Sequence, residues 1–259
     1  MAADPFNVIP SRRRIQSGGA EGILDIVEIV GLPLGMNGWD DHFQGDTLHG
    51  SYQSTASGAN SAVAAISTGL AGGAILLDPG DANAGRCDLS LGRHYYGQNN
   101  ATIWWKVQIN TVTNYKFELG FTDVISGTDA GAVATKSTPT FNADDFVGIV
   151  VDTTHNAIPS LMGVAATVAG TSIPFTGLTA LSAATYYYFG VSLRGTSAKG
   201  MILDADAKLI DQTAWMSAAI TADVLLTPWA FVQNRSGAQH AMTIDRVKAY
   251  QRDTTAAGA

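Results

Sequence analysis

Hydrophobic and polar side chains alternate along two neighbouring stretches of the chain. In the stretch 102–110, one face carries Ile103, Trp105, Val107 and Ile109. In the stretch 115–122, one face carries Tyr115, Phe117, Leu119 and Phe121. A period of two is typical of a β-strand that buries one face, so we expect a strand in each stretch. The Asn- and Thr-rich segment between them predicts a turn, which would make the pair a hairpin.

Other short runs rich in apolar and β-branched residues predict strands over most of the remaining chain. They cover residues 62–67, 74–78, 87–92, 146–151, 161–168, 186–193, 201–204, 229–233 and 242–250. Residues 217–224 are the one segment whose pattern allows a short helix, although Thr221 lowers its helical propensity.

The last of these runs changes phase along its length. Met242 and Ile244 share one phase, and Val247 and Ala249 take the other. One extra residue near 245–246 would produce this change, so the sequence predicts a β-bulge there.

The number of strands predicts the architecture. About a dozen strands cannot stay in one open sheet without curling, so we expect an all-β jelly-roll sandwich of two antiparallel sheets. The chain has 259 residues, which suits one β-sandwich domain. We assign residues 37–252 to the sandwich, residues 1–36 to an N-terminal arm, and residues 253–259 to a flexible C-terminal tail.

Strand periodicity also assigns the aromatic side chains to faces. It predicts a buried face that carries Trp105, Phe117, Phe121, Tyr187 and Phe189. It places Trp104, Tyr186 and Tyr188 on the opposite face, where they could stack on a sugar, contact another subunit, or be covered by the chain itself. We favour a protein contact, because no cluster of Asn, Asp and Arg accompanies the three rings in the sequence.

The N-terminal arm combines prolines and glycines with two further candidate docking features. The first is the cationic run Arg12, Arg13 and Arg14. The second is the apolar segment 23–30, whose apolar residues include Ile23, Leu24, Ile26, Val27 and Ile29. A lone strand must pair with another edge, so this segment either docks on a neighbouring subunit or completes the sandwich itself.

Composition narrows the possible partners. The chain has 15 basic and 22 acidic residues, and its net charge of −7 disfavours binding to nucleic acid. Its one cysteine, Cys87, excludes an intrachain disulfide. The N-terminal residues lack the layout of a signal peptide, and no apolar run reaches the length of a membrane span. We therefore expect a soluble protein without a membrane partner.

Candidate catalytic carboxylates are sparse. Glycoside hydrolysis needs two carboxylates that face one sugar bond, whereas Glu118, Asp204 and Asp245 are isolated in the strand pattern. Asp204 and Asp206 lie two residues apart, but in a segment that reads as a turn. We therefore expect no enzymatic activity and no cofactor.

Two acidic groups are candidate calcium sites. The first comprises Asp40, Asp41, His42, Asp46 and His49, and the second comprises Asp78, Asp81 and Asn83. Calcium takes six to eight oxygens from a compact loop. Strand alternation would scatter the first group over both faces, so we expect solvated carboxylates rather than a metal site.

An ordered set of motifs resembles the concanavalin A-like, or laminin-G-like, jelly-roll domains of tailed-bacteriophage virion proteins. The set comprises residues 39–48 (Trp-Asp-Asp-His-Phe-Gln-Gly-Asp-Thr-Leu), 73–77 (Gly-Ala-Ile-Leu-Leu), 104–109 (Trp-Trp-Lys-Val-Gln-Ile), 117–123 (Phe-Glu-Leu-Gly-Phe-Thr-Asp), 187–191 (Tyr-Tyr-Phe-Gly-Val), 201–204 (Met-Ile-Leu-Asp), 226–229 (Leu-Thr-Pro-Trp) and 244–247 (Ile-Asp-Arg-Val). The chain departs from the pattern at residues 204–206, where Asp-Ala-Asp replaces the usual Asp-Gly turn.

The resemblance implies a structural role in a phage particle. The chain would be a capsid decoration (cement) protein, or another head- or tail-associated jelly roll, made in the host cytoplasm and carried in the virion. Its partners would be other virion subunits and copies of itself. The alternative that the same fold implies is a lectin-like carbohydrate-binding module for host attachment, with a glycan as partner.

Overall fold

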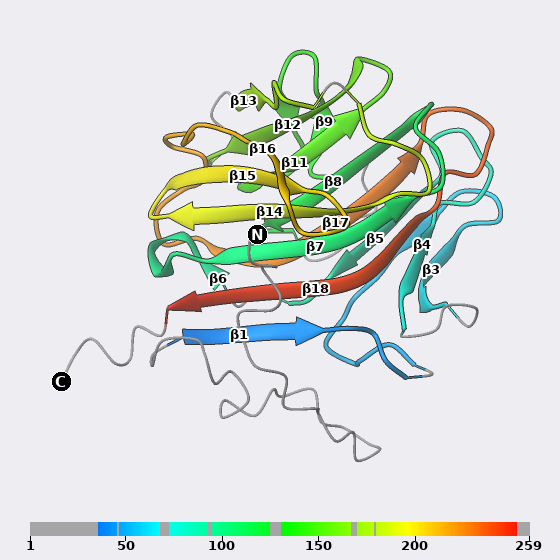
Figure 1. Ribbon diagram of the computed structural model, residues 1–259, viewed down its shortest axis with the longest axis horizontal. Coiled ribbons are helices and arrows are strands. Elements are labelled where there is room, and N and C mark those ends of the chain that lie inside the picture. The colour runs from blue at the N-terminus through cyan, green and yellow to red at the C-terminus, as the bar shows by residue number, and fades with distance from the viewer. Residues whose placement is uncertain are drawn as a thin grey trace.

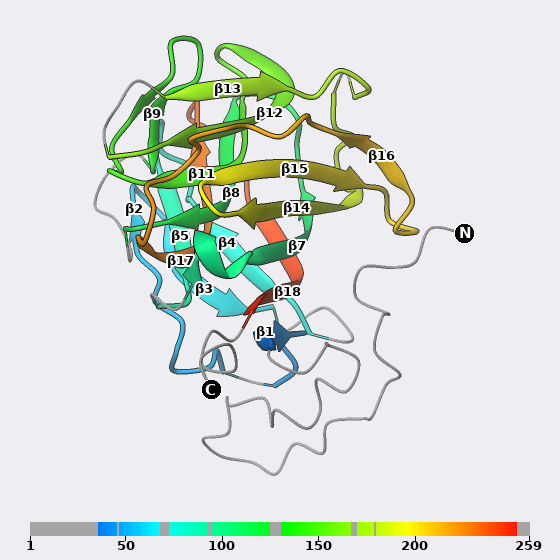
Figure 2. The same ribbon diagram turned by 90° about the vertical axis from the view of Figure 1, so that its left-hand side faces the viewer.

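Two large antiparallel sheets pack face to face in a computed structural model of the chain (Figure 1). The structure describes residues 36–45, 47–67, 73–92, 95–124, 131–166, 170–178 and 180–252. We call the two layers the β7 sheet and the β8 sheet, after a central strand of each; Figure 2 shows them from the side. The prediction of an all-β, two-sheet sandwich is confirmed.

The β7 sheet contains eight strands. Their spatial order is β16 (Leu209–Gln212), β15 (Ser197–Leu203), β14 (Tyr186–Arg194), β7 (Thr102–Ile109), β18 (Met242–Arg252), β4 (Ile75–Asp78) and β3 (Ala62–Ile66), and β1 (Met36–Asp41) also pairs with β18. The first and last of these strands along the chain therefore lie side by side, as Figure 1 shows.

The β8 sheet also contains eight strands. Their spatial order is β13 (Thr171–Pro174), β12 (Asn156–Val164), β11 (Phe146–Asp152), β8 (Tyr115–Thr122), β17 (Leu225–Asn234), β5 (Arg86–Ser90) and β2 (Ala56–Ser57), and β6 (Tyr95–Tyr96) pairs with β17. A separate two-stranded sheet consists of β9 (Val133–Thr135) and β10 (Thr140–Phe141).

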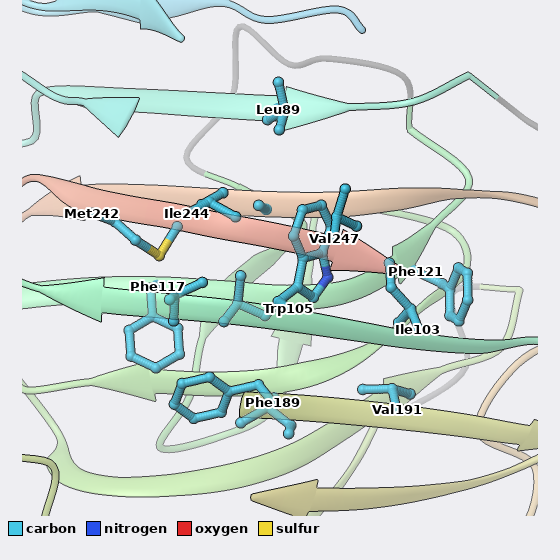
Figure 3. Packing of buried hydrophobic residues seen from close by; sticks show 14 of the residues in the cluster. Leu89, Ile103, Trp105, Phe117, Phe121, Phe189, Val191, Met242, Ile244 and Val247 are labelled. Carbon is cyan, nitrogen blue, oxygen red and sulfur yellow. The ribbon is translucent and has the colours of Figure 1, made fainter. Parts of the chain in front are cut away.

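The predicted core residues are buried between the two sheets (Figure 3). Trp105, Phe117, Phe121 and Phe189 are each at most 1% exposed, and Tyr187 is 8% exposed. The ring centroids of Phe117 on β8 and Phe189 on β14 are 5.4 Å apart, so the two layers interdigitate through their aromatic side chains. The predicted register of these strands is confirmed.

The predicted hairpin of 102–110 and 115–122 is wrong. β7 pairs with β14 and β18, whereas β8 pairs with β11 and β17 in the other layer. The segment 110–114 therefore crosses from one sheet to the other. Alternation shows that each strand buries one face, but two strands that face each other across a core have the same pattern as two hairpin partners.

The predicted bulge in the last strand is confirmed. Ile244 lies opposite Val107 and Arg246 lies opposite Lys106, so Asp245 is the extra residue in β18. The bulge lets the strand present apolar side chains to the core on both sides of the phase change.

The predicted helix at residues 217–224 is absent; this segment forms turns. Ala218 and Asp223 both have positive φ angles, of 50° and 60°, which a right-handed helix does not accept. Ala219 and Ile220 are buried in the core instead. No helix in the described part of the chain is long and apolar enough to cross a membrane.

A cover formed by residues 131–145 lies over the outer face of the β8 sheet. Its Ala132, Val133 and Ala143 are buried against Trp229 and Phe231 of β17. As a result, all eight residues of β8 are buried, on both faces of the strand. The expectation of a polar, solvent-facing side on this strand is wrong, because alternation cannot reveal a cover that comes from another part of the chain.

Candidate functional site

Two of the three predicted surface aromatics are covered by the chain itself. Trp104 and Tyr188 are each 6% exposed and pack with Leu203 and Ala207. The indole of Trp104 lies on Gly190, where a Cβ atom would stand 2.5 Å from the ring. The two rings are on the predicted face, but they offer no free contact surface.

The turn that follows β15 supplies part of this covering. Asp204 closes the turn, because its Oδ1 accepts hydrogen bonds from the backbone N–H groups of Asp206 and Lys208, at 3.0 and 2.9 Å. Ala207 adopts a φ angle of 59° and is buried against the aromatic cluster. This turn occupies the position at which the domains that the chain resembles have an Asp-Gly turn.

Tyr186, the third of these aromatics, is half-buried beside a charged pair. The Lys106 Nζ lies 5.2 Å from the centroid of the Tyr186 ring and 2.6 Å from Asp245 Oδ2. This cluster joins an aromatic face to a cation and a carboxylate at the bulge of β18.

The other predicted docking residues lie outside the described residues. These are Arg12, Arg13, Arg14, Ile23, Leu24, Ile26, Val27 and Ile29. Their role stays a prediction.

The carboxylates of the first candidate calcium site that the structure describes are engaged within the protein. Asp40 accepts two hydrogen bonds from Arg246, at 2.7 and 2.6 Å, and Asp41 accepts one from the hydroxyl of Tyr52, at 3.0 Å. Asp46 lies outside the described residues. Within the described ranges, no three His, Cys, Asp or Glu side chains are grouped so that they could hold a metal ion.

The second acidic group is similarly occupied. Asp78 accepts hydrogen bonds from the amide of Gln239, at 2.7 and 2.8 Å, and from the backbone N–H of Gly80. Asp81 accepts a hydrogen bond from the side chain of Asn60.

Glu118 of β8 is enclosed beneath the cover. It accepts hydrogen bonds from the backbone N–H groups of Ala132 and Val133, at 2.8 and 3.0 Å, and from the indole N–H of Trp229, at 3.0 Å. Lys116 completes its surroundings as an ion-pair partner. Every contact of this carboxylate is therefore structural, and the side chain is 0% exposed.

A row of polar residues crosses one end of the β8 sheet on its outer face. In spatial order the row consists of Arg86, Gln233, Lys116, Asp152 and Asn156. Residues that lie opposite each other in a ladder point to the same face, so these side chains share one surface. Lys116, Asp152 and Gln233 of this row are nonetheless buried.

A cavity of about 290 Å³ opens at this end. Its lining comes from three parts of the chain: Ala134, Thr135, Lys136 and Ser137 of the cover, Asp152, Thr154 and His155 at the turn from β11 to β12, and Arg235 just after β17. Almost all of these side chains are polar or charged, so the cavity suits a ligand rich in hydrogen-bonding groups rather than an apolar one.

Asp152 and Arg235 form an ion pair in the lining of this cavity. The Arg235 Nη2 lies 2.5 Å from Asp152 Oδ2, and its Nε lies 3.2 Å from Asp152 Oδ1. The N–H and hydroxyl of Thr154 also donate to Asp152, at 3.1 and 2.7 Å. Burial alone would raise the pKa of Asp152, but the hydrogen bonds from Arg235 and Thr154 outweigh it and lower this pKa.

Lys136 is buried beside this pair, with 4% of its surface exposed. Its Nζ donates hydrogen bonds to the side-chain and backbone oxygens of Asn156, at 2.8 and 3.4 Å, and to the carbonyl oxygen of Ile158. Burial lowers the pKa of Lys136 to about 8, and the charge of Asp152 only partly opposes this shift.

Sequence reasoning missed this site. The polar run Asp-Thr-Thr-His-Asn at residues 152–156 signals a turn between two strands, but many turns have such composition. Arg235 is 83 residues away from Asp152 along the chain. Only the spatial order of the strands brings the two residues together. The wrongly predicted hairpin gives a different strand order, so it does not predict this contact.

Comparison with known proteins identifies the fold. No family model matches the sequence, and no curated protein matches it either. Among solved structures, the chain is similar to a protein of unknown function from Shewanella oneidensis MR-1, with 10% identity and a TM-score of 0.58 over 91% of this chain and 98% of that one.

Two further solved structures are similar to the chain over most of its length. One is peanut lectin, with 9% identity and a TM-score of 0.54 over 83% of this chain and 97% of that one. The other is LamAcat from Zobellia galactanivorans, with 10% identity and a TM-score of 0.54 over 82% of this chain and 96% of that one. At these identities the likeness concerns architecture alone. The described chain therefore has the concanavalin A-like jelly-roll fold.

Proposed function

We propose that this protein is a carbohydrate-binding module that acts without catalysis. The observation that carries the proposal is the polar cavity, in which the Asp152–Arg235 pair holds hydrogen-bonding groups in fixed positions. Sugars present many hydroxyl groups, and fixed planar side chains such as carboxylates and guanidinium groups bond them with directional preference. Lectins among the structures of the same fold support the same reading.

The proposal of a non-catalytic role rests on the positions of the strand carboxylates. Glu118 lies on β8 beneath the cover, whereas Asp245 lies on β18 of the β7 sheet and Asp204 lies in the turn after β15 of that sheet. The thickness of the sandwich separates Glu118 from the other two, so none of them can act with Glu118 on one glycosidic bond. Solved structures of this fold also include a glycoside hydrolase, so the absence of activity needs a direct test.

The test is a glycan array with the full chain, followed by calorimetry on the glycans that bind. Ser137 lies exposed on the cavity rim, so Ser137→Tyr is expected to block the cavity and abolish binding without unfolding the protein. Ser51→Tyr is the matched control, at another exposed serine that does not line the cavity. Unchanged glycan binding by Ser137→Tyr would refute this location of the site.

The same glycans give the test for catalysis. Incubation of the bound polysaccharide with the protein is expected to release no reducing ends. Release that disappears in Glu118→Gln or Asp204→Asn would contradict the proposal.

A phage particle is the second candidate setting, and it rests on the ordered motifs at residues 39–247. In that setting the protein would be a virion component that contacts other virion subunits and copies of itself, and the glycan would belong to the host surface. Cofractionation with intact particles in fixed stoichiometry would support this setting. If the protein binds glycans on the array but never cofractionates with particles, the phage setting would be refuted and only the carbohydrate-binding proposal would remain.

A further inference from the structure

We propose that the cavity selects sugars that carry a carboxylate group, such as hexuronic acid residues. This inference rests on the proposed function and names the class of glycan. It is argued from the balance of charges at the cavity and from the donors that remain free there.

The cavity carries an uncompensated positive charge. Among the described lining residues, Lys136 and Arg235 are the two basic side chains, and Asp152 is the one carboxylate. Asp152 is engaged by Arg235 and Thr154, and its charge only partly offsets the cost of burying Lys136. The hydrogen-bond acceptors of Lys136 are uncharged oxygens of Asn156 and Ile158. Within the described ranges, no carboxylate forms an ion pair with Lys136.

A buried cation without a contacting anion favours an anionic ligand. Charged groups are costly to bury, and an opposite charge nearby recovers part of that cost. The lowered pKa of Lys136 is consistent with this cost. A carboxylate bound in the cavity would supply the missing negative charge in a region of low dielectric, where the attraction is stronger than in water.

Arg235 provides the directional contact. Asp152 holds its Nε and Nη2, which fixes the plane of the guanidinium group. Among the described residues, none accepts a hydrogen bond from its Nη1. A guanidinium group can bind one carboxylate side-on and still donate to a second acceptor from its remaining edge, so Arg235 is oriented to meet an incoming carboxylate.

The remaining lining favours a sugar over a simple anion or an apolar acid. Thr135, Ser137, Thr154 and His155 are exposed around the opening and offer hydroxyl and imidazole groups. These groups can bond several hydroxyls of one ring while the carboxylate meets Arg235. Among the described lining residues there is no Phe, Tyr or Trp, so recognition here depends on charge and hydrogen bonds rather than on stacking on a large ring.

The experiment compares ligands that differ only in the acidic group. Calorimetry with the full chain would use oligogalacturonate and galacto-oligosaccharide of equal length, with a sulfated galacto-oligosaccharide as a third probe. We expect oligogalacturonate to bind about tenfold more tightly than the neutral oligosaccharide, as one charge-assisted contact would give. Raising the salt concentration should reduce this preference.

Two rim variants make the test independent of folding. Ser137→Asp places a negative charge on the exposed rim, and Ser137→Asn has the same size without the charge. We expect Ser137→Asp to weaken the binding of oligogalacturonate several-fold relative to Ser137→Asn. The affinity for neutral sugars should not change. Arg194→Gln, an exposed arginine on β14 outside the cavity, is the control for a general change in charge.

The outcomes separate the two proposals. Equal affinity for the neutral and the uronate oligosaccharide would overturn the charge selectivity but leave carbohydrate binding intact. Preference for the sulfated probe over the uronate would also overturn it. Binding of none of the three probes, together with an empty glycan array, would remove the proposed function itself.

Discussion

Lys116 Nζ lies 2.7 Å from Glu118 Oε1, and the two side chains are 1% and 0% exposed. They are two residues apart on one face of β8, which alternation alone assigns to solvent. Their charges are compatible with burial because Glu118 also accepts three further hydrogen bonds and Lys116 donates to the carbonyl oxygen of Val133. The pair therefore ties the cover to the sheet.

Removal of one partner of this pair should be costly. We expect Lys116→Met to lower the free energy of unfolding by about 3–5 kcal/mol, because it leaves the buried charge of Glu118 uncompensated. Lys106→Met is the control: it breaks the partly exposed pair with Asp245, which should cost about 0–1 kcal/mol. Denaturant unfolding measures both, and equal costs would contradict a buried ion pair under a closed cover.

The contact between Trp104 and Gly190 predicts a second stability difference. Gly190→Ala places a methyl group 2.5 Å from the indole, which should cost about 1–3 kcal/mol and displace the ring. Gly50→Ala is the control, because no atom lies within 4 Å of the added Cβ there. A rise in the solvent accessibility of tryptophan in Gly190→Ala, measured by fluorescence quenching, would accompany the loss.

The burial of Lys136 predicts a dependence of stability on pH. Its pKa falls from 10.5 to about 8 on folding, so between these values the unfolded chain binds the proton more tightly than the folded one. Stability should therefore rise with pH across this window, by up to about 1.4 kcal/mol per pH unit. The raised pKa of Cys87 acts in the opposite direction above pH 9.

The difference between wild type and Lys136→Met isolates this effect, because the contribution of Cys87 is common to both. Unfolding free energies should be measured from pH 7.5 to 10. The free energy should rise more steeply with pH in the wild type than in Lys136→Met. Parallel curves would show that Lys136 keeps its ordinary pKa in the folded protein.

The bulge in β18 predicts that two single-residue deletions differ in their effect on stability. Deletion of Asp245 leaves Ile244 opposite Val107 and Arg246 opposite Lys106 in a regular ladder, so the core faces are preserved. Deletion of Lys248 instead turns the buried Ala249 out of phase. We expect the first deletion to cost about 1 kcal/mol and the second several times more, as measured by thermal unfolding.

The arm gives the last prediction. Deletion of residues 1–35 keeps β1, which begins at Met36, and should leave a folded sandwich that has lost its affinity for partner subunits. Circular dichroism and analytical ultracentrifugation against the full chain provide the measurements. A truncated chain that does not fold would instead make the apolar segment 23–30 an integral strand, the alternative that the sequence leaves open.

Sequence alone predicted the long strands and their inner faces, but it missed short strands such as β9 (Val133–Thr135) and β13 (Thr171–Pro174). The core positions Trp105 and Phe189 and the bulge at Asp245 followed from alternation, which depends only on neighbours along the chain. The partners of each strand did not follow, because alternation does not distinguish a hairpin from two strands in opposite layers. The burial of Glu118 and the cavity at Asp152 and Arg235 depend on a cover and a crossover formed by distant segments.

The pairing of β1 with β18 has a consequence for the connectivity of the chain. Met36 lies opposite Arg252 in that ladder, so the two ends of the described region meet at one edge of the β7 sheet. A short peptide could join them and turn the sandwich into a closed ring. New termini could then be cut at the β14–β15 turn, where Gly195 has a positive φ and an added Cβ would meet no atom within 4 Å. The fold is thus suited to circular permutation, which would move the chain ends to the β14–β15 turn and leave the cavity in place.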